Sequence, residues 1–235
     1  MNLHWKKAFD QLLPSLGQGI GVVLYVTVLG FLGALIIALL LAIGRVSKNK
    51  VLNRILVLFI EFIRGTPLLV QFFYIYSVVP MLIDGLAAVF GAETNVQISA
   101  TLSGIIGFSI NYGCYMSEVI RSAILAVDPG QREAGLALGF SETQVLFRFI
   151  IPPAIRNSIP VFGNYLVMMI KDTSLLAMIS VQELLLRAKT FASQTFLTVE
   201  AYTIVAVVYL LLSVPLSRLS VALESHLKRA RMKRK

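Results

Sequence analysis

The chain has 235 residues, of which 57% are hydrophobic and only 14% are charged, and its mean hydropathy is +0.81. A soluble domain of this composition would lack the polar surface to cover itself, so the composition excludes an ordinary soluble protein. It predicts an all-α, polytopic membrane protein in a lipid bilayer. The formal net charge is +9, but the basic residues gather beside long apolar runs, at 45–54 and 228–235. We therefore expect no nucleic-acid partner.

The first predicted element is an outer interfacial segment, residues 1–18, in which Trp5 and several leucines are mixed with charged residues. We expect a short helix there that ends at Pro14 and lies on the membrane surface. The run at 20–43 contains no charged residue, and as a helix it would extend about 36 Å against a hydrocarbon core of about 30 Å. It is too long for the core of a cleavable signal, so we expect it to be retained as a spanning helix.

Four further apolar runs bring the prediction to five transmembrane helices in one permease-like domain, residues 19–223. These runs lie at 55–79, 98–127, 154–179 and 201–221. A basic cytoplasmic tail, residues 224–235, follows them. With the N-terminus outside, fifteen Lys and Arg residues fall in cytoplasmic segments and five in outer ones. This bias predicts that the N-terminus is outside and the C-terminus is cytoplasmic.

The second predicted span contains the sequence Gly-Thr-Pro at 65–67, which predicts a break, because proline removes a backbone donor and clashes with the preceding turn. Such a break is compatible with a structural kink or with a role in solute binding. Arg64 in this span and Glu118 in the third span come out at similar depth, roughly 10–15 Å from the cytoplasmic ends. An unpaired charge there costs at least about 2.5 kcal/mol, so we predict that Glu61, Arg64 and Glu118 form an intramembrane ion-pair group.

The segment between the third and fourth spans, residues 128–153, is too polar to span and too patterned for a slack loop. It opens with Asp-Pro-Gly-Gln, which predicts a helix start with Asp as N-cap and Pro at the first helical position. Small residues follow at 134, 135, 137 and 139, and they would let another protein approach the backbone closely. The prolines at 152 and 153 predict the end of the element. An amphipathic helix lying on the membrane is the alternative, but it would not need this glycine spacing.

This segment resembles the cytoplasmic loop of the membrane subunits of ATP-binding-cassette importers, which carries Glu-Ala-Ala, a glycine, and an Ile-x-Leu-Pro ending. Here the pattern starts at Glu133, Gly135 replaces the second alanine, and the ending is Phe-Ile-Ile-Pro at 149–152. In that family the loop forms a coupling helix that docks in a groove of the ATPase subunit. The resemblance assigns this role to Glu133, Ala134, Gly139 and Pro152.

Four further stretches are similar to the polar amino-acid branch of these importers, the glutamine, glutamate, histidine and arginine permeases. They are Glu61 to Pro67 continuing to Gln71; Asn111 to Arg121; Pro160 with Asn164; and Lys171 to Leu175 followed by Glu183. The resemblance implies a permease of the bacterial cytoplasmic (inner) membrane that imports a polar amino acid. It also implies an identical or homologous second permease subunit, two ATPase subunits and an extracytoplasmic substrate-binding protein. The sequence leaves open which amino acid is carried.

We predict the substrate site between the third span, at Asn111 and Tyr115, and the end of the fourth, at Lys171, Asp172, Thr173 and Ser174. An amino acid brings a carboxylate for Lys171 and an ammonium group for Asp172, and inside a bilayer both groups need partners. Asn111 would hydrogen-bond the carboxylate or a polar side chain. The alternative is that Lys171 and Asp172 pair with each other or with the fifth span and only close a helix end.

No Gly-x-x-x-x-Gly-Lys-Ser/Thr phosphate loop occurs, so we expect ATP to be bound and hydrolysed by partner subunits, and this chain to be neither an enzyme nor a cofactor protein. His4 and His226 lie far apart in the sequence and indicate no metal site, and Cys114 is expected to be a packed thiol. Two other classes stay open. An ion-driven secondary carrier would use Glu118 as its ion site, but would not need the coupling segment. A structural membrane protein would not need charges in three spans.

Overall fold

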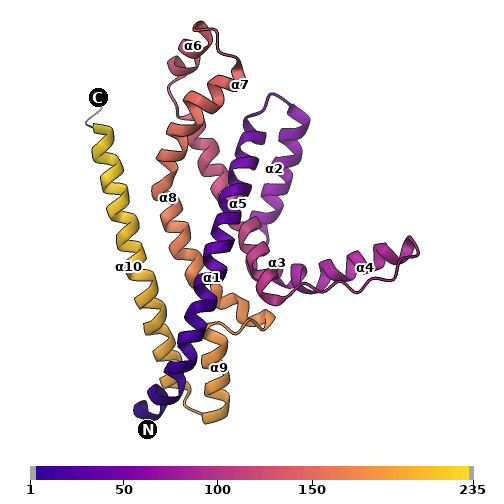
Figure 1. Cartoon of the computed structure of the whole chain (residues 1–235), viewed down its shortest axis with the longest axis vertical. Coiled ribbons are helices and arrows are strands. Elements are labelled where there is room, and N and C mark those ends of the chain that lie inside the picture. The colour runs from indigo at the N-terminus through magenta and orange to yellow at the C-terminus, as the bar shows by residue number, and fades with distance from the viewer. Residues whose placement is uncertain (1–3, 233–235) are drawn as a thin grey trace.

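The computed structural model describes residues 4–232, with side chains through residue 225, and every regular element in that range is a helix. The all-α prediction is therefore confirmed. The bundle is built from four long helices: α1 (Trp5–Val46), α5 (Ala100–Leu125), α8 (Ile151–Asp172) and α10 (Thr198–Met232). Figure 1 shows them along the long axis of the molecule, while α4 (Val79–Val89) leaves the bundle to one side.

Helix α1 is a single helix of 42 residues, about 63 Å long, and Pro14 lies inside it. The predicted helix end at Pro14 is therefore wrong. Leu12 and Leu16, on either side of the proline, are fully buried in a cluster with α9 (Leu184–Thr195) and the start of α10. This packing on both sides of Pro14 offsets the backbone hydrogen bond that the proline removes.

The second predicted span is not one continuous helix. Helix α2 (Lys50–Gly65) ends at the predicted break, and α3 (Leu68–Phe73) begins after it. Thr66 and Pro67 are extended, with ψ of 144° and 135°, because the proline ring disfavours the helical conformation of the residue before it. The chain then continues through the π-helical segment η1 (Tyr74–Val78) into α4 and away from the bundle axis (Figure 1).

Helix α5 forms where the third span was predicted, and it lies at the centre of the bundle. Half of it is buried, including Ser103, Ser109 and Asn111. Glycines on α1 permit this close packing, since a methyl group at Gly30 would lie 2.9 Å from Phe108 Cβ. Because protein rather than lipid surrounds much of α5, this helix can carry more polar residues than a lipid-facing one.

Among the described residues, four stretches are both long and apolar enough to cross a membrane: Trp5–Val46, Leu68–Val89, Glu142–Ile179 and Thr198–Ser225. The first, fourth and fifth predicted spans fall within three of them. Helix α2 is short and α5 is polar, so neither is among the four. The protein is thus polytopic and all-helical, and the predicted count of five spans is not reproduced by length and composition alone.

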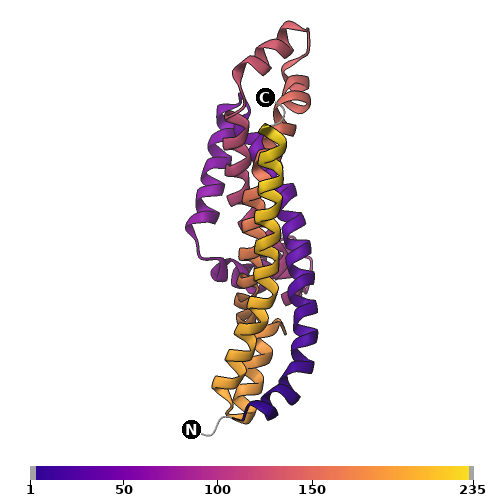
Figure 2. The ribbon, with the colours of Figure 1, turned by 90° about the vertical axis from the view of Figure 1, so that its left-hand side faces the viewer.

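The two ends of the bundle differ. Figures 1 and 2 place α6 (Pro129–Ala137), α7 (Glu142–Val145) and the end of α10 at one end, and the start of α1 with α9 at the other. The N- and C-terminal ends of the described chain therefore lie at opposite ends of the bundle. The basic loop between α1 and α2 lies at the α6 end, since Lys48 contacts Glu142.

Candidate solute-binding and coupling sites

The break between α2 and α3 is closed by two side chains, Thr66 and Gln71. The Thr66 hydroxyl lies within 3.1 Å of the Phe62 carbonyl oxygen and 3.2 Å of the Ile63 carbonyl oxygen, to which it can donate. Gln71 Nε2 donates to the carbonyl oxygens of Ile63 (2.7 Å) and Thr66 (3.1 Å) and to Thr66 Oγ1 (2.9 Å), and so adds hydrogen bonds to backbone acceptors at the break. Its Oε1 accepts from Asn111 Nδ2 of α5 at 3.1 Å. Asn111, predicted as a solute ligand, is 6% exposed and has its donor engaged in this way. Its position therefore makes it a brace for the break, and direct contact with a solute stays a prediction.

Three tyrosines connect α2, α5 and α8; we refer to Tyr112, Tyr115 and Tyr165 as the tyrosine row. The Arg64 guanidinium carbon lies 4.9 Å from the centre of the Tyr115 ring, and the Tyr115 hydroxyl donates to the Arg64 carbonyl at 3.3 Å. Tyr165 of α8 lies between the other two, at 6.4 Å from Tyr115 and 5.9 Å from Tyr112 between ring centres. At the far end, the Tyr112 hydroxyl donates to Asp172 Oδ2 at 2.6 Å.

The tyrosine row thus joins two of the predicted site residues, Tyr115 and Asp172, through two residues that the sequence-based site omitted. A signal for Tyr112 was available, because residues three apart share a helix face and Tyr112 precedes Tyr115 by three. Tyr165 gave no such signal, since its contact depends on how α8 packs against α5.

Residues 171–174 have separate roles where α8 tightens into the 3₁₀ segment η3 (Thr173–Ile179). The Thr173 hydroxyl donates to the Ile170 carbonyl at 2.6 Å, and the Ser174 hydroxyl donates to the Lys171 carbonyl at 2.8 Å. These hydroxyls serve the helix end, and their contact with a solute stays a prediction. Lys171 is exposed, and its ammonium group has no hydrogen bond or ion pair among the described residues. Within the described residues Lys171 pairs neither with Asp172 nor with the fifth span, so for Lys171 the alternative is wrong.

The predicted ion-pair group of Glu61, Arg64 and Glu118 is also wrong. Glu118 pairs with Arg121, three residues along the same helix (2.9 Å), and with Arg45 of α1 (3.5 Å). Glu61 and Arg64 are exposed and form no ion pair within the described part of the chain. The break after Arg64 directs this side chain to the Tyr115 ring, while Glu118 faces α1, and sequence spacing could not reveal either orientation.

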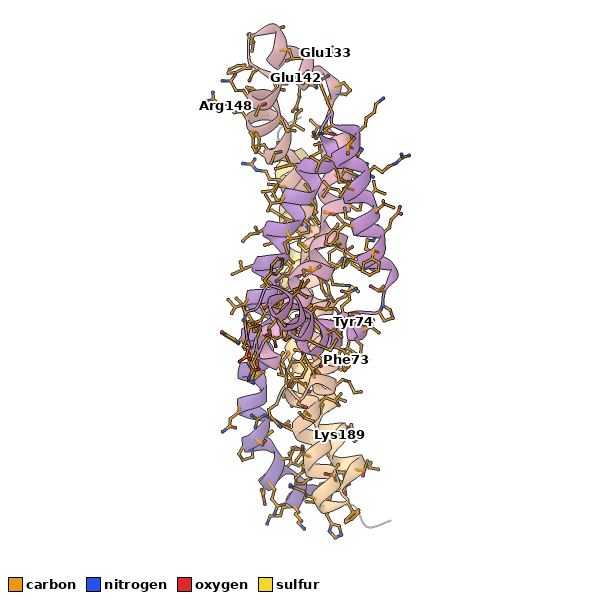
Figure 3. All side chains as sticks on the ribbon, turned by 90° about the vertical axis from the view of Figure 1, so that its right-hand side faces the viewer. Phe73, Tyr74, Glu133, Glu142, Arg148 and Lys189 are labelled. Carbon is orange, nitrogen blue, oxygen red and sulfur yellow. The ribbon has the colours of Figure 1, made fainter. Side chains whose placement is uncertain are left out.

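The predicted coupling segment forms α6 and α7, at the end of the bundle where Figure 3 shows Glu133 and Glu142. Glu133 and Ala134 are exposed on α6. Gly139 follows α6 with a φ of +82°, a left-handed conformation that favours glycine. Gly135 instead faces inward, since a methyl group there would lie 2.8 Å from Val145 Cγ2 of α7.

Pro152 does not end the coupling element, so that part of the prediction is wrong. The chain stays helical from α7 through the π-helical segment η2 (Leu146–Ile150) into α8, where Pro152 and Pro153 occupy the first turn. Proline is tolerated in the first turn of a helix, and the wider π turn before it accommodates the change in hydrogen bonding. The coupling segment and α8 therefore form one continuous helical path.

One carboxylate ties the coupling segment to the rest of the bundle. Glu142 accepts two short hydrogen bonds from Arg132 Nη2 of α6, at 2.6 and 2.7 Å, and one from Lys48 Nζ of the α1–α2 loop, at 3.2 Å. The hydrogen bonds to Glu142 raise the pKa of the Arg132 guanidinium, because they favour its charged form. A displacement of α6 would reach both α8 and the α1–α2 loop.

The fold and these sites define a class of protein: a polytopic helical subunit with charged and aromatic groups inside its bundle and an exposed helical segment at one end through which another protein can drive it. Residues 11–229 match the family described as "Binding-protein-dependent transport system inner membrane component". The chain belongs to this family. It is the transmembrane subunit of an ATP-binding-cassette importer, in which separate subunits hydrolyse ATP, and the ion-driven carrier is excluded.

Several known proteins are similar to this chain. The "Glutamine transport system permease protein GlnP" of Escherichia coli (strain K12) is 35% identical over 228 residues, 97% of this chain and 99% of GlnP. The "L-cystine transport system permease protein TcyB" of Bacillus subtilis (strain 168) is 38% identical over 192 residues, 82% of this chain and 77% of TcyB. The crystal structure of an amino acid ABC transporter with histidines matches 96% of this chain and 100% of its own with a TM-score of 0.80 and 30% identity.

Proposed function

We propose that this chain is the permease subunit of an importer that carries a polar α-amino acid across the bacterial cytoplasmic membrane. The observation that carries the proposal is the tyrosine row, because it connects a carboxylate, Asp172, with a cation, Arg64. A second cation, Lys171, adjoins Asp172 in the sequence. Relatives described as permeases for glutamine and for cystine support an amino acid as the substrate class.

Opposite charges of this kind suit a zwitterion. Asp172 would accept the ammonium group of the amino acid, because Tyr112 fixes Oδ2 and no described residue donates to Oδ1. Lys171, exposed and without a carboxylate partner in the described chain, would meet the α-carboxylate. Asp172 is half-buried, and charge pairs away from bulk water interact more strongly than in water.

The conformational change that drives transport would begin at the α6 end of the bundle. We infer that the exposed face of α6, with Glu133, Ala134 and the turn at Gly139, docks on a partner ATPase. Leu138 is 76% exposed beside this turn, as expected of an apolar side chain that a partner covers. From α6, movement would pass along η2 into α8, which ends at Asp172.

The proposed orientation has the N-terminus outside and the C-terminus and α6 in the cytoplasm, with residues 19–223 as the membrane domain. Two permease subunits, identical or homologous, would pair, and a substrate-binding protein would deliver the amino acid at the outer end. Single cysteines replacing Asp84 and Arg132 test the orientation with an impermeant thiol reagent on intact cells. We expect labelling at position 84 only, and labelling at position 132 only would overturn the orientation.

Uptake into proteoliposomes that contain the complete complex tests the proposed function. Labelled glutamine, glutamate, histidine, arginine and cystine are supplied one at a time through the binding protein, with ATP or with a proton or sodium gradient. We expect uptake of at least one of these amino acids with ATP and none with a gradient alone. Uptake of none of them by a complex that hydrolyses ATP in response to its binding protein would contradict the amino-acid assignment.

A further inference from the structure

Three polar side chains lie along one side of α8, with the exposed apolar side chains of Val161 and Met168 between them on the same face. Asn157, Asn164 and Lys171 are spaced seven residues apart, so they lie on one face with a drift of only about 20° per step. All three are exposed. None of their side chains has a hydrogen bond or an ion pair with any other part of the described chain. We refer to these three residues as the α8 polar stripe.

The stripe occupies the side of α8 that its neighbours leave open. On one flank Gly163 packs against α10, where a methyl group would lie 2.6 Å from Ser220 Oγ. On the other flank Tyr165 packs against Tyr112 and Tyr115 of α5. Other polar groups on α8 do have partners, since the Ser158 hydroxyl donates to the Ala154 carbonyl at 2.9 Å. The neighbours of α8 thus leave Asn157, Asn164 and Lys171 without a partner among the described residues.

A membrane-spanning helix cannot present such a face to lipid at low cost. The stripe lies within residues 142–179, one of the stretches long and apolar enough to span. From Asn157 to Lys171 it extends about 21 Å along the helix, and a hydrocarbon core is about 30 Å thick. Unpartnered amides and ammonium groups within a spanning helix face a cavity or another protein. By contrast, the exposed side chains of α10 at Leu211 and Leu219 are apolar, as lipid contact requires.

We propose that the α8 polar stripe is the wall of the solute path in the assembled importer, and that the migrating amino acid and its water meet Asn157, Asn164 and Lys171 in turn. This inference rests on the proposed function for the identity of the solute. An amide carries both donors and acceptors, so Asn157 and Asn164 can bond either the carboxylate or the ammonium group of a zwitterion. The amides bear no charge, which lets the solute leave each position, whereas Lys171 beside Asp172 supplies the charged binding position.

Thiol accessibility tests the stripe. Cys114 is buried and is replaced by Ala in the parent chain, into which Asn157→Cys, Asn164→Cys, Leu211→Cys and Leu219→Cys are introduced one at a time. Position 219 matches position 164 in depth, because Gly163 contacts the neighbouring Ser220. Each complete complex in proteoliposomes is treated with a charged, water-soluble methanethiosulfonate, with and without ATP, and the modification rate and remaining uptake are measured.

We expect positions 157 and 164 to be modified at least tenfold faster than 211 and 219 in at least one nucleotide state. Modification at 164 should abolish uptake and should be slowed by saturating amino acid. Rates at 157 and 164 no faster than at 211 would overturn the proposal, and a disulfide between two copies at 164 would then assign this face to subunit packing. Rapid modification that leaves uptake intact would also overturn it.

The experiment separates this inference from the proposed function. If the parent complex takes up an amino acid with ATP but its stripe cysteines do not react, only the stripe is refuted. If the stripe cysteines react rapidly but the parent complex takes up none of the amino acids supplied, the amino-acid assignment is refuted and the water-lined wall stands.

Discussion

Tyr112→Phe removes the hydroxyl that donates to Asp172 Oδ2 across 2.6 Å and leaves the aromatic ring in place. The ring contacts with Phe108 and Tyr165, at 6.0 and 5.9 Å between centres, do not need the hydroxyl. A hydrogen bond to a charged group contributes roughly 1.5–3 kcal/mol, and we take the lower end because Asp172 is half-buried. About 1.4 kcal/mol corresponds to a factor of ten, so the apparent KM for the transported amino acid should rise about tenfold.

The assay is initial uptake over a range of amino-acid concentrations, together with ATP hydrolysis in the absence of the amino acid. Tyr165→Phe is the matched control, because it removes a hydroxyl from the same tyrosine row for which no hydrogen bond to another described residue is seen. ATP hydrolysis and membrane insertion should remain at the parent level in both variants. An unchanged KM in Tyr112→Phe, or an equal rise in Tyr165→Phe, would refute the assignment of Asp172 as a positioned ligand.

Three further predictions concern the break, the coupling turn and the ion pairs. Gln71→Leu removes the Nε2 donor at the helix break, so the free energy of unfolding should fall by about 1–3 kcal/mol, measured as a lower Tm in detergent. An equal fall in Tm for the exposed Gln97→Leu would contradict this. Gly139→Leu places a side chain at a φ of +82° on the proposed docking face, and it should reduce uptake without reducing membrane insertion. Normal uptake and normal ATPase rates in this variant would show that the turn has no role in coupling. Glu118→Gln removes the carboxylate that pairs with Arg45 and Arg121, and it should lower Tm more than Glu61→Gln, because the Glu61 side chain is exposed. Equal changes in Tm would contradict these ion pairs.

Much of the fold was predictable because long apolar runs and turn chemistry are local properties. The break at Pro67 and the helix start at Asp128 depend only on the residues beside them, and both were predicted correctly. The end predicted at Pro14 failed because contacts with α9 and α10, distant in sequence, hold α1 continuous. Helix α5 can carry polar residues because its neighbours bury it, and the hydropathy of the sequence does not report burial.

The candidate site was predicted as a set of residue types rather than as a set of contacts. Asp172 lies at the end of α8, where a charge at the end of a span was predicted, but its hydrogen-bond partner is Tyr112 and not Lys171, the partner in the alternative interpretation. Similar depth suggested that Arg64 pairs with Glu118, yet the direction of each side chain around its helix sends them to different neighbours. Depth follows from counting residues along a helix, whereas direction follows from how the helices pack.

Binding of a radiolabelled amino acid to the purified complex, in the absence of the binding protein, tests the central claim most directly. The amino acid used is the one whose uptake the complete complex supports. The account predicts saturable binding that Asp172→Asn abolishes or weakens at least tenfold and that Glu61→Gln leaves unchanged, because Glu61 is exposed and forms no ion pair within the described part of the chain. Binding that survives Asp172→Asn with unaltered affinity would contradict the account.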